Sequence, residues 1–280
     1  MSDRQYHWQP DWDDAFNNMG YVANASALPQ QWTAAAKAFR DTQPNAQLDV
    51  AYGDGPRECL DLFTPANTAL GLIVFVHGGY WRLFDKSTWS HLAAGALARG
   101  WAVALPSYPL CPAVTLPDIA PRIASAIAHA AQLVPGPIRL AGHSAGGHLV
   151  ARMANIPALL PTEVAARVTG ITTISGLHDL RPLVHTKMNA DFGMDIATAA
   201  GDSPALLAPS NTCPVTAWVG AQERPEFLRQ TRLLEENWSR AGQDIRAVYD
   251  PGHNHFTVIQ GLAQANSPLT NAILGGPDTL

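Results

Sequence analysis

The chain has 280 residues, of which 47% are hydrophobic and 15% are charged, and its formal net charge is −5. This apolar content is enough for a sizeable core, and one large α/β domain fits the length as well as two small ones. The negative charge, together with the absence of a Lys/Arg-rich run, argues against a nucleic acid or an anionic membrane as a partner.

The cysteines and the first residues of the chain argue against disulfide-rich, zinc-binding, secreted and membrane-spanning proteins. Cys59, Cys111 and Cys213 are scattered and form no C-x-x-C pair, so neither a disulfide framework nor a zinc site is predicted. The opening "MSDRQYHWQPDWDD" is polar and acidic, unlike a signal peptide, and no apolar run reaches the ~18–20 residues of a membrane span. We therefore expect a soluble cytoplasmic protein. A homodimer is compatible with the sequence.

The N-terminal part of the chain differs from the rest. Within residues 1–45, the stretch 11–41 predicts short helices with two tryptophans, and we expect the whole segment to cover the functional site. Residues 47–53 and 58–65 alternate apolar and polar side chains, as in a half-exposed hairpin. Residues 70–80, "LGLIVFVHGGY", are a continuous apolar run, which is typical of a strand buried on both faces.

Helical and strand patterns then alternate. Residues 87–100 have helical spacing, with Ser87 as the expected N-cap and Gly100 as the end. Strands are predicted at 101–108, 138–142, 168–177, 213–221 and 244–250, and helices at 116–134, 145–155, 225–242 and 255–274.

This order predicts the fold class α/β. Doubly buried strands that alternate with helices indicate a mostly parallel central sheet with helices on both faces, and the hairpin adds an antiparallel N-terminal edge. Residues 46–280 then form the main domain, within which residues 178–212 are an irregular, cap-like insertion with short helical pieces.

The first candidate for chemistry is "GHSAG", Gly142–Gly146, which fits G-x-S-x-G. A predicted strand precedes Ser144 and a predicted helix follows it, as a nucleophile on a strained strand-to-helix turn requires. We expect Gly142 and Gly146 to be steric requirements of that turn, and the backbone N–H of Ala145 to stabilise an oxyanion. The alternative is an ordinary small-residue turn.

The second candidate is "HGGYW", His77–Trp81, at the end of the buried strand. Backbone N–H groups of such a loop supply the other half of an oxyanion hole in esterases with an HGGG-type motif. Gly79 and Tyr80 are the expected donors, and Gly78 is expected to shape the turn. The alternative is a plain Gly-Gly turn after a strand.

A nucleophilic serine also needs an acid and a base. Glu223 follows the strand at 213–221, where a carboxylate orients a histidine. Glu226, Asp179 and a purely solvated Glu223 are the alternatives. The loop before the last predicted helix holds His253 and His255. His255, next to the helix, is the preferred base, which gives the chain order Ser–acid–His.

Other chemistries have little support. The spacing of His253 and His255 also suggests metal ligands, but no H-E-x-x-H motif or cysteine cluster completes a zinc site, so no metal is predicted. No G-x-G-x-x-G follows a strand and no phosphate-binding G-x-x-x-x-G-K-[ST] occurs, so no cofactor is predicted. His77, His143 and His148 are interpreted as structural.

The motifs "HGGYW", "GHSAGGHL", "WVGAQERPEF" and "HNHF", in this order, resemble the kynurenine formamidase (arylformamidase) branch of the α/β-hydrolases, near the hormone-sensitive-lipase-like esterases. "VAYGDG", "SGLHDLRPLV" and "GDSPALL" extend the resemblance over most of the chain from about residue 48. That branch usually has Asp where this chain has Glu223. The resemblance implies an α/β-hydrolase fold with Ser144 as nucleophile, Glu223 as acid and His255 as base.

The resemblance also implies that the protein hydrolyses an N-formyl aryl amide, namely N-formylkynurenine to kynurenine and formate. The aromatic part of the substrate is then expected to stack on Trp81, Tyr80 or Phe192. A carboxylesterase for small short-acyl or aryl esters is the alternative, because the same parts hydrolyse such esters. A binding protein without catalysis and a metal-dependent amidohydrolase are weaker alternatives.

Overall fold

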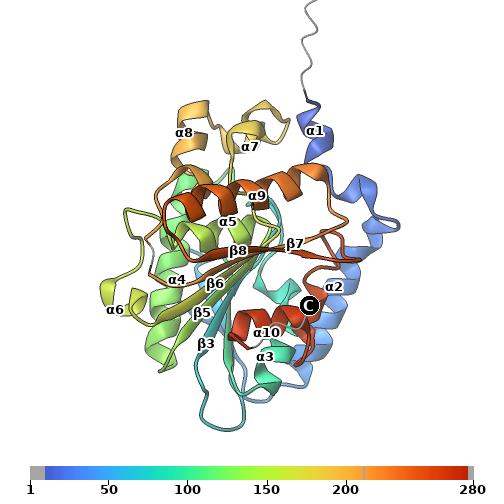
Figure 1. Ribbon diagram of the computed structural model, residues 1–280. Helices are drawn as coiled ribbons and strands as arrows, with labels where there is room; N and C mark the ends of the chain where they lie inside the picture. The colour runs from blue at the N-terminus through green and yellow to red at the C-terminus, as the bar shows by residue number, and fades with distance from the viewer. Residues whose placement is uncertain (1–9, 211, 277–280) are drawn as a thin grey trace, which may run out of the picture.

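The computed structural model describes residues 10–210 and 212–276, and an eight-stranded sheet runs through the centre of this part (Figure 1). Its strand order is β1-β2-β4-β3-β5-β6-β7-β8. β1 and β2 form an antiparallel hairpin, β2 pairs antiparallel with β4, and all other neighbours are parallel. The strands are β1 Gln47–Ala51, β2 Cys59–Phe63, β3 Leu72–Val76, β4 Ala102–Pro106, β5 Ile138–His143, β6 Val168–Ile174, β7 Val215–Gly220 and β8 Ile245–Asp250.

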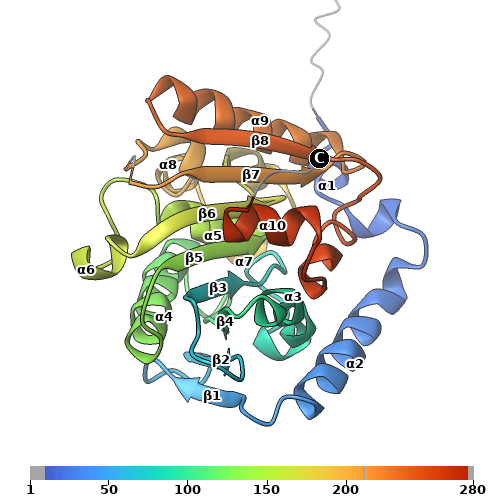
Figure 2. The same ribbon diagram turned by 60° about the horizontal axis from the view of Figure 1, so that its bottom comes forward.

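Helices cover both faces of the sheet (Figures 1 and 2). α4, α5 and α9 lie on one face, and α2, α3 and α10 lie on the other. The helices of these two layers are α4 Ile119–Leu133, α5 Ala145–Arg152, α9 Pro225–Arg240, α2 Leu28–Asp41, α3 Ala94–Ala98 and α10 Pro268–Leu274. The predicted α/β fold with an antiparallel N-terminal edge is confirmed.

The apolar run of β3 explains why the sheet has two cores. Leu72, Val74 and Val76 pack into the cluster beneath α4, α5 and α9. Ile73 and Phe75 alternate with them and pack beneath α2, α3 and α10. Because successive side chains of a strand point to opposite faces, only a strand that is apolar throughout can serve both cores.

Short elements fill the N-terminal segment and the insertion after β6. The blue segment in Figure 1 runs from α1 to α2 along one side of the molecule. Its elements are α1 Trp12–Ala15, η1 Met19–Tyr21 and η2 Ala25–Ala27. The insertion consists of η6 Arg181–His185, α7 Asn189–Phe192, α8 Ile196–Gly201 and η7 Pro204–Leu206, and the remaining short elements are η3 Lys86–Thr88, η4 Ser90–Ala93, η5 Leu116–Asp118, α6 Thr162–Ala165 and η8 Gln260–Ala263.

Two predicted helices are wrong as continuous elements. The helix expected at 87–100 is split into η3, η4 and α3, and its N-cap is Asp85, whose carboxylate accepts from Ser87 N, instead of Ser87. Trp89 has the non-helical backbone angles φ −119° and ψ 4°, and its ring packs on Trp32 at a centroid distance of 4.9 Å. This contact between distant segments outweighs the local helical spacing.

The tail expected as one helix at 255–274 is also interrupted. Turns and η8 occupy its first half, and α10 starts only at Pro268. Ser267 caps α10 by accepting from Thr270 N, and Pro268 occupies the first helical turn, where its missing N–H costs nothing. Within the described ranges, no helix is both long enough and apolar enough to span a bilayer.

Candidate active site

Ser144 lies on a sharp turn between β5 and α5. Its backbone angles are φ 56° and ψ −117°, outside the conformations that a side chain usually tolerates. A Cβ at Gly146 would lie 2.0 Å from the carbonyl oxygen of Val76, and one at Gly142 would lie 2.2 Å from that of Gly146. Both glycines are therefore steric requirements of the turn, which holds the Ser144 side chain at the carboxyl end of the sheet.

His255 and Glu223 continue from Ser144 in a chain of hydrogen bonds. Ser144 Oγ lies 3.1 Å from His255 Nε2, and His255 Nδ1 lies 2.7 Å from Glu223 Oε2. All three side chains are buried. Because the carboxylate can only accept, His255 carries its proton on Nδ1 and leaves Nε2 able to accept the Ser144 proton.

Two donors hold the far oxygen of Glu223. Ser175 Oγ donates to Oε1 at 2.5 Å, and the backbone N–H of Gly220 donates to the same oxygen at 2.9 Å. Charge-assisted bonds of this kind fix a carboxylate strongly. Ser175 begins the stretch "SGLHDLRPLV", but nothing in that stretch marks it as a partner of the acid. It faces Glu223 because β6 and β7 are neighbours in the sheet.

The rival acids have other partners. Asp179 is ion-paired with Arg181 at 2.8 Å and with Arg229 at 3.3 Å. Burial alone raises the pKa of Asp179, but the hydrogen bond from Arg181 and the charges of both arginines lower it below the usual value. Glu226 accepts from Arg229 and from Gln230, each at 2.7 Å. Neither carboxylate contacts His255.

The other histidine of this loop, His253, has different hydrogen-bond partners. His253 Nδ1 lies 3.3 Å from Thr257 Oγ1, and the His253 carbonyl accepts from Gln222 N at 2.9 Å. Among the residues that the structure describes, no group of three or more His, Cys, Asp and Glu side chains is arranged to hold a metal ion.

The loop after β3 lies against Ser144. A Cβ at Gly78 would lie 3.0 Å from Ser144 Cβ, so this glycine allows the two turns to approach closely. Gly79 and Tyr80 follow with positive φ of 116° and 48°. Within the described residues, the N–H groups of Gly79 and Tyr80 donate to no protein acceptor, and the N–H of Ala145 is in the first turn of α5, so all three are available to an oxyanion.

The buried histidines near the site are neutral and structural. His143 Nε2 donates to the His255 carbonyl at 2.9 Å, and His148 Nε2 donates to the Asp202 carbonyl at 2.8 Å. His77 Nδ1 donates to the Gly78 carbonyl at 2.7 Å, as expected for a residue that orders the loop. Burial lowers the pKa of His77 to about 4 and that of His178 to about 3, and it also lowers the pKa values of His143 and His148.

These pKa values predict acid sensitivity. The unfolded chain binds protons at these histidines below about pH 6.5, whereas the folded chain does not until a much lower pH. The free energy of unfolding is therefore expected to fall as the pH drops from about 6.5 toward 4, by up to about 1.4 kcal/mol per pH unit for each histidine. Urea unfolding at several pH values measures this slope. His178→Gln should make it shallower, and a pH-independent stability would contradict the assignment.

A pocket of about 420 Å³ opens above Ser144 and His255. Trp32 forms the centre of its aromatic wall, with ring centroids 4.9 Å from Trp89, 5.7 Å from Phe256 and 5.9 Å from Phe84. Tyr80, Leu83 and Met188 add apolar surface. The N-terminal segment contributes Asp13, Phe16, Asn17, Asn18, Met19, Pro29 and Trp32 to the lining.

Two residues expected to stack on the substrate lie outside this pocket. Trp81 is fully buried with its ring edge-on to His148 at 5.1 Å, and Phe192 packs edge-on against Trp81 at 5.7 Å. Both rings pack behind the His77–Trp81 loop. The prediction that they contact the substrate does not agree with these positions. Tyr80 does line the pocket, and its buried hydroxyl donates to the Phe16 carbonyl at 2.7 Å.

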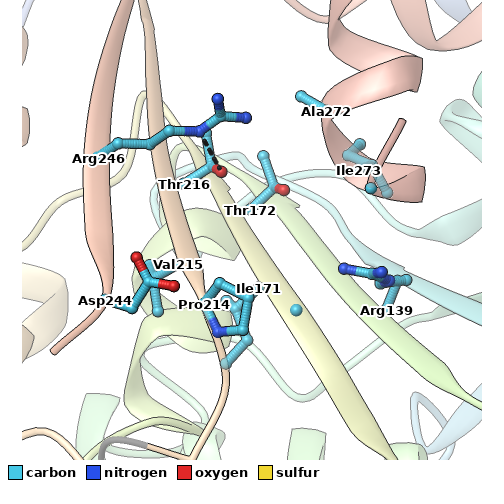
Figure 3. A pocket seen from close by; sticks show the side chains of 12 residues that line it. Arg139, Ile171, Thr172, Pro214, Val215, Thr216, Asp244, Arg246, Ala272 and Ile273 are labelled. Atoms are coloured by element: carbon cyan, nitrogen blue, oxygen red, sulfur yellow. Dashed lines mark hydrogen bonds between the residues drawn. The ribbon is translucent and has the colours of Figure 1, made fainter. Parts of the chain in front are cut away.

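A second pocket, of about 220 Å³, lies at the opposite end of the parallel strands (Figure 3). Arg139, Thr216 and Arg246 belong to the first residues of β5, β7 and β8, and Arg246 Nε donates to Thr216 Oγ1 at 3.3 Å. Ser144, Glu223 and His255 are not among its lining residues. Since ligands of open α/β sheets bind at the carboxyl ends of the strands, the larger pocket is the candidate active site.

Comparison with known proteins agrees with this geometry. The profile described as the alpha/beta hydrolase family matches residues 73–278, well over half of the chain. The chain belongs to this family. Among relatives of the hydrolase, the kynurenine formamidase of Salmo salar is 28% identical over 246 residues, which cover 81% of this chain and 80% of that protein. The Danio rerio kynurenine formamidase is 27% identical over 262 residues, which cover 90% and 87%.

A solved structure is still more similar. A protein from Silicibacter sp. TM1040, provisionally named a thioesterase, is 47% identical and superposes with a TM-score of 0.89, covering 95% of the hydrolase and all of that chain. The predicted resemblance to the kynurenine formamidase branch is confirmed, and so is the prediction that the protein is a hydrolase. The roles of individual residues are argued below from geometry.

Proposed function

We propose that the hydrolase cleaves N-formyl aryl amides by covalent catalysis, with Ser144 as nucleophile, His255 as general base and acid, and Glu223 as the orienting acid. The observation that carries this proposal is the chain Ser144–His255–Glu223 beneath an aromatic-walled pocket. The wall suits an aryl group, and the relatives named kynurenine formamidase suggest N-formylkynurenine as the substrate to test first.

The reaction follows from the positions of the atoms. Ser144 Oγ attacks the formyl carbon while its proton passes to His255 Nε2. The N–H groups of Gly79, Tyr80 and Ala145 stabilise the resulting oxyanion, with Gly78 allowing the loop to approach, and each donor is worth about 10²–10³ in rate. His255 then protonates the leaving aryl amine, and water hydrolyses the formyl-enzyme to formate.

The pocket gives the N-terminal segment a role in this proposal. Phe16, Met19 and Trp32 line the pocket from a part of the chain that lies outside the sheet. The backbone of this segment is joined to the oxyanion loop by the Tyr80–Phe16 hydrogen bond. We therefore propose that residues 10–45 cover the active site and exclude water from it, which strengthens hydrogen bonds to the oxyanion.

The substrate is tested by comparing kcat/KM for N-formylkynurenine with that for p-nitrophenyl acetate. The proposal predicts the higher value for the formyl amide, and no loss of activity in EDTA. Comparable or reversed values would instead favour a carboxylesterase for short acyl chains. The solved relative provisionally named a thioesterase is the observation that favours this second candidate, because thioesters and activated esters require the same serine chemistry.

A further inference from the structure

The lining of the pocket above Ser144 includes a negative charge and no positive charge from Lys or Arg. Asp13 is the one carboxylate among its described lining residues, and those residues include no Lys or Arg. The rest of the lining is aromatic, aliphatic or uncharged apart from the two histidines, His143 and His255. A charged substrate group that enters this pocket therefore meets one lining carboxylate, whose side chain is 40% exposed.

The contacts of Asp13 leave it able to bind a further donor. Asp13 Oδ1 accepts from the backbone N–H of Lys187 at 2.8 Å, and Oδ2 lies 3.7 Å from Lys187 Nζ. The Lys187 side chain is 92% exposed, so this long surface ion pair is weak. A carboxylate has about four acceptor positions, so Asp13 keeps capacity for another hydrogen bond.

We propose that Asp13 selects substrates by charge, favouring an aryl group that carries an ammonium and disfavouring one that carries only a carboxylate. This inference rests on the proposed function, because it concerns the leaving group of the same reaction. An ammonium gains a charge-assisted hydrogen bond from Asp13. A substrate carboxylate finds no Lys or Arg in this lining and is repelled by Asp13.

Three formanilides of similar size test the preference. Formanilide is neutral, 3-formamidobenzylamine carries an ammonium, and 3-formamidobenzoate carries a carboxylate. The ratio of kcat/KM for the ammonium substrate to that for the carboxylate substrate is expected to fall at least about tenfold in Asp13→Asn. Asparagine keeps an acceptor for Lys187 N–H, and the wild-type ratio should also decrease as salt screens the charge.

Asp14 supplies the matched control. It belongs to the same helix, pairs with Arg224 and accepts from the Tyr21 hydroxyl at 2.6 Å, but it does not line the pocket. Asp14→Asn should leave the substrate ratio unchanged even where it loosens the segment. If Asp13→Asn lowers kcat/KM for all three substrates by one common factor, or leaves the ratio unchanged, Asp13 only anchors the segment and the inference is wrong.

Failure of the Asp13 inference can be distinguished from failure of the formamidase proposal. If the wild-type enzyme hydrolyses none of the three formamides, the formamidase proposal fails. The acetate esters of phenol, 3-hydroxybenzylamine and 3-hydroxybenzoate then present the same three charges to the same pocket. A charge preference among these esters that Asp13→Asn removes would support the role of Asp13, and the absence of a preference would overturn it.

Discussion

Ser144→Ala is expected to lower kcat by about 10⁶-fold, because removal of the nucleophile leaves only binding and oxyanion stabilisation. The one hydrogen bond of Ser144 Oγ within the described residues is to His255, so the change removes no structural contact of the side chain. Alanine keeps the Cβ and faces the same backbone angles as serine. The measurement is kcat on the best formamide or ester, together with the thermal unfolding midpoint.

The folded state is the control for this variant. An unfolding midpoint close to that of the wild type, together with loss of activity, assigns the defect to chemistry. Residual activity above about one per cent, with the protein folded and free of wild-type contamination, would contradict a nucleophilic role for Ser144.

Glu223→Gln is expected to lower kcat by about 10⁴-fold. Ser175 Oγ and Gly220 N both donate to the Oε1 position, so the amide oxygen of glutamine must occupy it. The amide NH₂ then faces His255 Nδ1, which becomes an acceptor. The imidazole proton moves to Nε2, where it prevents acceptance of the Ser144 proton.

Asp179→Asn and Glu226→Gln are the comparison variants for the acid. Both carboxylates pair with arginines and neither contacts His255, so each change is expected to affect stability more than kcat. A large loss of kcat in Asp179→Asn, combined with near-normal kcat in Glu223→Gln, would overturn the assignment of the acid. A steady-state measurement on purified, folded variants decides between these outcomes.

The sequence was sufficient to predict that the three candidate catalytic residues lie close together, because each of them follows the end of a strand. The carboxyl ends of parallel strands meet at one edge of a sheet, so Ser144 after β5, Glu223 after β7 and His255 after β8 are brought together by topology alone. The glycines around Ser144 followed from the same strand-to-helix turn.

The pocket wall was not predictable in the same way. Trp32 and Phe256 are more than two hundred positions apart, and no local pattern indicates that their rings meet above Ser144. Trp81 was expected at the substrate because it adjoins the expected oxyanion loop, and Phe192 because it belongs to the irregular insertion at 178–212. The left-handed backbone of Trp81, φ 54°, instead accompanies a ring packed against His148, and such a backbone is not readable from sequence periodicity.

Ser175 and the interrupted helices illustrate the same limit. Ser175, directly after β6, donates to Glu223, and Trp89 interrupts a helical pattern and packs on Trp32. Both depend on contacts between segments far apart in the chain, which override local propensity.

Labelling with a fluorophosphonate tests the central claim most directly, because an activated serine attacks the phosphorus, displaces fluoride and keeps the adduct. Intact mass spectrometry should show one adduct on the wild-type protein, and peptide mapping should place it on Ser144. Ser144→Ala should remain unlabelled, and Glu223→Gln should react far more slowly. An unlabelled wild-type protein, or an adduct that persists in Ser144→Ala, would contradict the account of Ser144 as the nucleophile of this hydrolase.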